Sequence, residues 1–163
     1  MSEFVNMHCL YQYAKNETVE DLENFDYIYN NVMEGNYTFR LNDIILLCEL
    51  QIQNYPYMEP QHESKIMDMV FSTVNEYGIN VAFPELLKGL EEVIGVKMHL
   101  VGMYLRMMLS SYNEEMVLQF AHMLKSCSND FKTNVKQLVI ESINLNPKRY
   151  EIKGNIILEN MEA

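Results

Sequence analysis

Apolar side chains recur every three or four residues through most of this chain of 163 residues. In the stretch between Thr18 and Gly35, the recurring apolar residues are Val19, Leu22, Phe25, Ile28 and Val32. That spacing places them on one face of an α-helix. Thr18 suits the N-cap, Asp21 can complete a capping box, and Gly35 can adopt the left-handed conformation that ends a helix. The sequence therefore predicts an amphipathic helix here.

Capping and stop residues divide the rest of the chain into further helices, with almost no strand signal. We expect them at about 3–14, 42–54, 61–77, 84–94, 96–109, 113–127 and 128–144, with a last one opening at Asn146-Pro147. Pro84 is interpreted as a first helical residue, because the N–H that proline lacks is unpaired at that position anyway. Gly78 is interpreted as a helix stop. The prediction is an all-α chain of about eight antiparallel helices in one domain, 1–163.

The helices follow one another in pairs. Helix pairs that recur roughly every 30–40 residues are typical of a short α-solenoid of the HEAT or armadillo type. No repeated consensus accompanies the pairs, because the X-Pro starts at Pro84 and Pro147 are followed by glycine at different offsets. An irregular helical bundle is therefore the alternative architecture.

Acidic residues are concentrated in the N-terminal part. The formal net charge of the whole chain is −11. Residues 1–64 contain 11 acidic side chains but only Lys15 and Arg40 as cations, a net charge of −9, whereas residues 65–163 have 12 acidic and 10 basic side chains. Because phosphates would be repelled by such a surface, the asymmetry disfavours binding to nucleic acid and favours a basic protein partner on the N-terminal side.

Other features of the sequence bear on where the protein resides. The longest apolar run, Ile44 to Cys48, is far too short to span a membrane, and the first residues lack a basic segment followed by an apolar one. The three cysteines, Cys9, Cys48 and Cys127, are odd in number and widely separated, which is typical of free thiols in a reducing compartment. The sequence predicts a cytoplasmic protein without membrane contact.

The chain has no recognisable constellation of catalytic or metal-ligating residues. Its one Glu-x-x-His motif, Glu59 to His62, stands alone, whereas a di-iron bundle needs two such motifs and further carboxylates. His99 and His122 lie in Met- and Leu-rich helical segments. Nucleophile elbow, P-loop and dinucleotide fingerprints are missing. We therefore predict no catalytic residue, no metal and no cofactor; an enzyme with an unfamiliar site is a distant alternative.

Arg106 is the one charged residue in the run from Met98 to Leu109, which is otherwise apolar nearly all round except for His99. Such a helix is expected to be buried by its neighbours. A guanidinium in that setting needs a carboxylate or helix-end carbonyls, and Glu141 or Asp130 could supply the carboxylate. We predict a structural role for Arg106.

The predicted helix after Thr18 lies in a stretch with six carboxylates and no cation. Tyrosines accompany these acids. In an interface, aromatic rings bury surface area and carboxylates steer a basic partner, so the combination suits the recognition of a basic protein. The candidate binding residues are Glu17, Glu20, Asp21, Glu23, Asp26, Tyr27, Glu34 and Tyr37. The alternative is a charged face that only keeps the protein soluble.

Residues 69–157 carry a resemblance to a known family. The segments "FPELLKGLEEVIG", "YLRMMLSSYNEE" and "FKTNVKQLVIESINLNPKRYEIKG" resemble small all-helical immunity proteins of bacterial polymorphic-toxin and contact-dependent growth inhibition systems. The positions that match are Glu85, Leu86, Leu87, Arg106, Leu109, Ser110, Lys132, Val135 and Pro147.

The resemblance implies a cytoplasmic inhibitor that binds the C-terminal domain of one cognate toxin and occludes its active site or substrate groove. Many such toxins are basic nucleases, so we expect a basic nuclease partner, an RNase before a DNase, drawn in by the acidic N-terminal half. The alternative from another class is a HEAT-like scaffold that joins proteins without inhibiting an enzyme.

Overall fold

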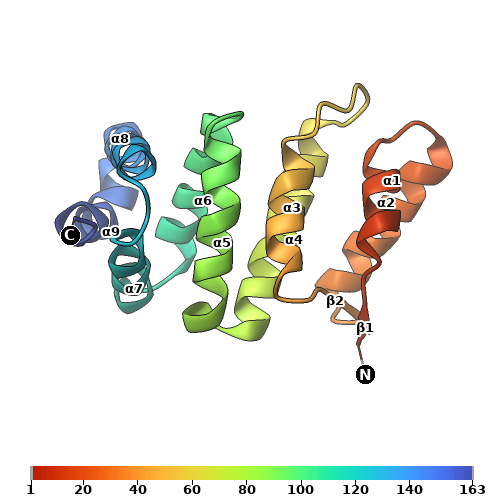
Figure 1. Cartoon of the computed structure of the whole chain (residues 1–163), viewed down its shortest axis with the longest axis horizontal. Coiled ribbons are helices and arrows are strands. Elements are labelled where there is room, and N and C mark those ends of the chain that lie inside the picture. The colour runs from red at the N-terminus through yellow and green to blue at the C-terminus, as the bar shows by residue number, and fades with distance from the viewer. Residues whose placement is uncertain (1, 163) are drawn as a thin grey trace. The chain divides into compact units, whose positions relative to one another are not determined.

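The computed structural model describes residues 2–162, of which 76% are helical (Figure 1). The helices in this range are α1 (Met7–Ala14), α2 (Val19–Met33), α3 (Asp43–Gln51), α4 (Pro60–Tyr77), α5 (Ile79–Ile94), α6 (Met98–Ser111), α7 (Glu114–Leu124), α8 (Asn129–Leu145) and α9 (Pro147–Asn160). Two short strands, β1 (Glu3–Phe4) and β2 (Tyr37–Thr38), complete the described elements. The predicted all-α class is confirmed, and both a solenoid and a bundle fit these helices.

The chain divides into two compact units, Met1–Gly89 and Leu90–Ala163. In the first unit α1 packs against α2, α3 packs against α4, and α2 also contacts α4. Figure 1 shows α1 with α2 and α3 with α4 as neighbouring pairs. The core of this unit is apolar and includes Leu10, Phe25, Phe39, Ile44, Leu47, Ile66, Met69 and Val70. That the chain forms a single domain stays a prediction.

The caps of α2 are those that the sequence predicts. The backbone N–H of Asp21 donates to Thr18 Oγ1 at 3.0 Å, and the N–H of Thr18 donates to Asp21 Oδ2 at 3.1 Å, which forms the capping box. Gly35 has a φ of +83° after the helix end. The expected apolar stripe was partly wrong, because Val19 is 74% exposed and Leu22 is also exposed. Side chains two positions apart point about 200° apart on a helix, so an inward Asp21 turns Val19 outward.

The N-terminal segment was wrongly predicted as helix from residue 3. Glu3 and Phe4 instead pair in parallel with Tyr37 and Thr38, and the N–H of Glu3 donates to the carbonyl of Asn36 at 3.1 Å. Asn6 Oδ1 then accepts the N–H of Cys9 at 3.1 Å. Because Asn6 is an N-cap with extended backbone, α1 begins only at Met7.

The start of α5 was also wrongly predicted, because Pro84 lies inside the helix rather than at its first residue. Gly78, with a φ of +88°, ends α4 as expected. Its carbonyl also accepts the N–H groups of Val81 and Ala82 at 3.3 and 2.9 Å. These bonds give the next helix its first turn ahead of the proline, so α5 begins at Ile79.

In the second unit, α9 packs against α6, α7 and α8, and α6 packs against α8. Local signals predicted the starts of α7, α8 and α9 correctly, whereas α6 begins at Met98 rather than at residue 96. Asn113 Oδ1 accepts the N–H of Met116 at 2.9 Å, Ser128 Oγ accepts the N–H of Phe131 at 3.2 Å, and Pro147 is the first residue of α9. Within residues 2–162, no helix combines the length and the apolar character that crossing a membrane requires.

Candidate recognition surface

One side of α2 presents three carboxylates and a tyrosine. These residues follow one another at intervals of three, four and seven, which places them on one face of the helix. All four are exposed, and we call them the acidic face: Glu20, Glu23, Tyr27 and Glu34. Neither of the two ion pairs found among the described residues involves a carboxylate of this face. Its three negative charges are therefore available to a partner.

Asp21 and Asp26, which the sequence also suggested as contacts, have structural partners. Asp21 is only 8% exposed, and its Oδ2 accepts the N–H groups of Glu17 and Thr18. Asp26 Oδ1 lies 2.7 Å from Lys65 Nζ on α4. Glu17 is exposed and precedes the helix. The structure thus separates the carboxylates that hold α2 in place from those that face outward.

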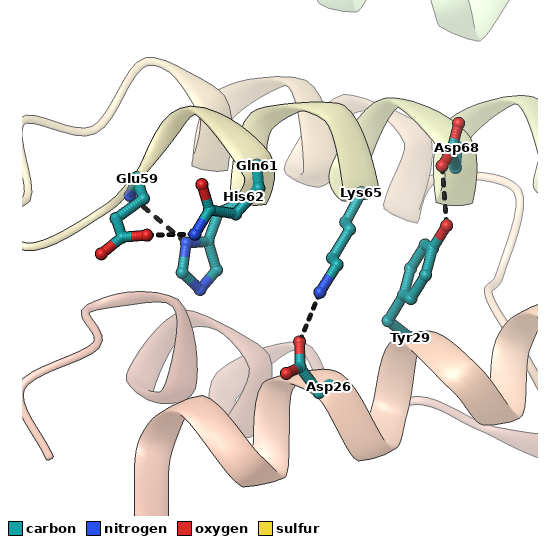
Figure 2. Close-up of polar contacts among 7 residues, drawn as sticks. All are labelled: Asp26, Tyr29, Glu59, Gln61, His62, Lys65 and Asp68. Atoms are coloured by element: carbon teal, nitrogen blue, oxygen red, sulfur yellow. Dashed lines mark hydrogen bonds and ion pairs between the residues drawn. The ribbon is translucent and has the colours of Figure 1, made fainter. Parts of the chain in front are cut away.

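The side of α2 that carries Asp26 is closed by α4, as Figure 2 shows. The Tyr29 hydroxyl donates to Asp68 Oδ2 at 2.7 Å, and Lys65 Nζ lies 5.4 Å from the centre of the Tyr29 ring. Burial, followed by the bond to Asp68, raises the pKa of Tyr29 to about 12. The phenol therefore stays protonated and continues to donate at physiological pH.

The Glu59-x-x-His62 motif forms the start of α4. The N–H of Glu59 donates to His62 Nδ1 at 3.3 Å, and the Gln61 side-chain amide donates to the Glu59 carboxylate (Figure 2). His62 is 1% exposed and its ring meets Phe25 edge-on, with centroids 4.6 Å apart. Burial lowers the pKa of His62. Its Nε2 has no hydrogen-bond partner in the described part of the chain.

Tyr27 and Tyr37 line an open pocket of about 320 Å³ on the first unit. The pocket lies among β1, α1, α2 and β2, and its lining residues are Glu3, Phe4, Val5, Asn6, Cys9, Tyr13, Asn24, Tyr27, Ile28 and Tyr37. The rings of Tyr27 and Tyr37 have centroids 6.1 Å apart and planes inclined at 71°. They form an aromatic corner next to the acidic face.

Carboxylates lie near two phenols of this pocket. A side-chain hydrogen bond with Tyr27, then burial and the charge of Glu3, raise the pKa of Tyr37. Burial, then Cys9 and the charges of Glu20 and Asp21, raise the pKa of Tyr13. The pocket therefore combines aromatic walls with nearby carboxylates, a combination that suits a cation.

The geometry joins the acidic face and the pocket through Tyr27, which belongs to both. No protein-family model, curated protein or solved structure matches this chain. The function is therefore inferred from this surface and from the sequence resemblance, which stays an expectation.

Sequence reasoning missed Glu3 and Phe4 as pocket residues, because the segment was interpreted as helix. Asn6 was the signal in the sequence that could have corrected this, because a good N-cap residue at position 6 indicates that the helix begins after it. Among the tyrosines near the acids, Tyr11 is used structurally, since its hydroxyl donates to the carbonyl of Leu46 at 2.8 Å. The structure assigns Tyr13, Tyr27 and Tyr37 to the pocket.

Arg106 has neither of the carboxylate partners that the sequence suggested. Among residues 2–162 it forms no ion pair with Glu141 or Asp130, and Glu141 accepts the Gln137 amide at 3.0 Å instead. A Cβ at Gly102 would lie 3.2 Å from Arg106 Nη1, so the guanidinium rests against the helix surface that this glycine leaves open. Neither of the two possible carboxylate partners is therefore paired with Arg106, and its structural role stays a prediction.

Proposed function

We propose that this chain is an immunity protein that binds and neutralises a basic toxin domain. The observation that carries the proposal is the acidic face, whose exposed carboxylates have no cation paired with them in the part of the chain that is described. Unpaired surface charge of one sign steers a partner of the opposite sign and raises the association rate.

The chemistry of the surface favours a nuclease as the toxin. Nucleases that bind polyanionic substrates need basic grooves, so an acidic face with an adjacent aromatic pocket is complementary to them. When the basic groove of a nuclease binds to this face, this chain covers the groove that would otherwise hold RNA or DNA. The proposal is inhibition of a nuclease, an RNase before a DNase, by occlusion of its active site or substrate groove in the cytoplasm.

The test uses the C-terminal domain of whatever large secreted protein proves to be encoded immediately upstream of this chain, and absence of such a gene counts against the proposal. Co-purification, calorimetry at two salt concentrations and a nuclease assay with the purified domain measure binding and inhibition separately. We expect a dissociation constant of about 1 nM, weaker binding at high salt and loss of nuclease activity at one equivalent. Absence of binding overturns the proposal. Binding without inhibition overturns it in favour of the scaffold.

A matched pair of variants tests the role of the acidic face. Glu23→Lys with Glu34→Lys reverses two charges on the acidic face without placing a lysine in the first turn of α2. Glu151→Lys with Glu159→Lys makes the same change of net charge at exposed positions of α9. At low salt we expect the first pair to slow association about tenfold and the second to change it much less. Equal slowing would mean that only net charge matters and that the acidic face is not the contact.

A further inference from the structure

We propose that the pocket beside the acidic face receives an arginine side chain of the protein partner. This inference rests on the proposed function and adds to it the group that the partner inserts. The acidic face brings a basic surface close, whereas the pocket offers one side chain a defined place between aromatic rings. The acidic face thus steers the partner, and the adjoining pocket binds one of its side chains.

The aromatic corner has the geometry for a planar cation. Tyr27 is 58% exposed, and its ring and that of Tyr37 are inclined at 71° with centroids 6.1 Å apart. A guanidinium that stacks flat on one of these rings can therefore point its N–H groups at the second ring or at the hydroxyl of the second tyrosine. The pocket volume of about 320 Å³ is at the lower end of the range for small-ligand sites, about 300–1,000 Å³, which suits one side chain.

The charges at the pocket favour a cation over a neutral group. Glu3 lies close enough to Tyr37, and Glu20 to Tyr13, to raise the pKa of each phenol. The carboxylate of Glu3 is on β1, at the pocket lining itself. Because the pocket is open, a side chain can enter it while its backbone stays with the partner.

Arginine fits better than lysine because its guanidinium stacks flat on rings and is weakly hydrated. The chain already contains one such contact at this pocket, where the guanidinium carbon of Arg40 lies 4.2 Å from the centre of the Phe4 ring. Among residues 2–162, no cation–π contact joins Arg40 to Tyr27 or Tyr37, so we assign the corner of these two rings to a guanidinium from outside. The internal pair shows the kind of contact that we assign to the partner.

The first test does not involve a toxin. N-acetyl-arginine amide is titrated into the full chain, with the neutral isostere N-acetyl-citrulline amide as control, and the ring-proton shifts of Tyr27 and Tyr37 are followed by NMR. We expect saturable shifts in the millimolar range with the arginine compound and much weaker ones with citrulline. Equal shifts with both compounds, or none with either, overturn the inference.

Two variants of Tyr27 separate ring stacking from simple bulk. Tyr27→Phe keeps the aromatic face, and Tyr27→Leu keeps apolar volume without it. Because Tyr27 is largely exposed, neither change opens the core. We expect the leucine variant to weaken binding of the arginine compound about two- to fivefold and the phenylalanine variant to change it little, as for other cation–π contacts. Equal loss in both variants contradicts the stacking contact.

The same variants in complex with the toxin domain distinguish this inference from the proposed function. If the wild-type chain binds and inhibits the domain while Tyr27→Leu leaves its affinity unchanged, the pocket is not used and the inference fails alone. If the arginine compound binds at Tyr27 but the domain does not bind, the proposed function fails. Loss of affinity for the domain in Tyr27→Leu, with recovery in Tyr27→Phe, supports both.

Discussion

Lys65 Nζ lies 2.7 Å from Asp26 Oδ1, and this ion pair joins α4 to α2 across 39 residues of sequence. The Asp26 and Lys65 side chains are each about one third exposed, so solvent screens part of the attraction. The pair nevertheless decides which carboxylates of α2 are available to a partner, because it neutralises one of the acids that the sequence presents.

We expect Asp26→Asn to weaken the fold slightly and to leave partner association almost unchanged. A double-mutant cycle with Lys65→Met, followed by urea unfolding, is expected to give a coupling energy of about 0.5–1 kcal/mol. Association at low salt is measured beside Glu23→Gln, which removes the same charge from the acidic face. If Asp26→Asn slows association as much as Glu23→Gln does, Asp26 belongs to the contact surface after all.

Stability is expected to fall on acidification because of His62. Burial lowers the pKa of this histidine in the folded chain below its ordinary value of about 6.5. The unfolded chain therefore binds the proton first as pH drops through 6.5, and the free energy of unfolding decreases down to the folded pKa. His62→Asn keeps an acceptor for the N–H of Glu59 but does not titrate. Urea unfolding at pH 7.0 and 5.5 should show a smaller decrease for the variant; equal decreases would assign the effect to other groups.

Gly89 is a position where a methyl group should destabilise the first unit. A Cβ there would lie 2.6 Å from Cys48 Sγ and 2.9 Å from Cys48 Cβ, both inside the core. We expect Gly89→Ala to cost about 1–3 kcal/mol through overpacking, and Cys48→Ala to restore part of the loss in the double variant. Gly95→Ala is the control, because a Cβ at Gly95 has no heavy atom within 4 Å. Similar stability of both alanine variants in urea unfolding would contradict the close approach.

Cys9 should be the thiol that alkylating reagents modify first. It lines the pocket and is partly exposed, whereas Cys48 is completely buried. Burial, followed by the neighbouring Glu91, raises the pKa of Cys127 to about 12, so very little reactive thiolate forms there at pH 8. A time course with iodoacetamide, analysed by peptide mass spectrometry, measures the order. Modification of Cys127 at the rate of Cys9 would contradict it.

The same thiol gives an independent readout of pocket occupancy. A partner side chain in the pocket shields Cys9, which is part of the pocket lining. We expect the bound toxin domain to slow alkylation of Cys9, and unprotected Cys9 in a saturated complex would contradict occupancy of the pocket.

Features that depend on neighbours three or four residues away could be predicted from the order of the residues alone. The capping box of Thr18 and Asp21, the caps Asn113 and Ser128, and the left-handed Gly35 are local, because the groups that bond lie within one turn of each other. The all-α class follows from the same short-range periodicity.

Which of the acidic and aromatic residues form a surface depends instead on long-range packing. Asp26 meets Lys65, and Glu3 aligns with Tyr37, through contacts between residues more than 30 positions apart in sequence. Such pairs depend on which helix faces are buried together and on the register of two strands, and helical periodicity contains no information about either. For this reason the sequence could predict that an acidic helix exists, but not that its Tyr27 borders a pocket.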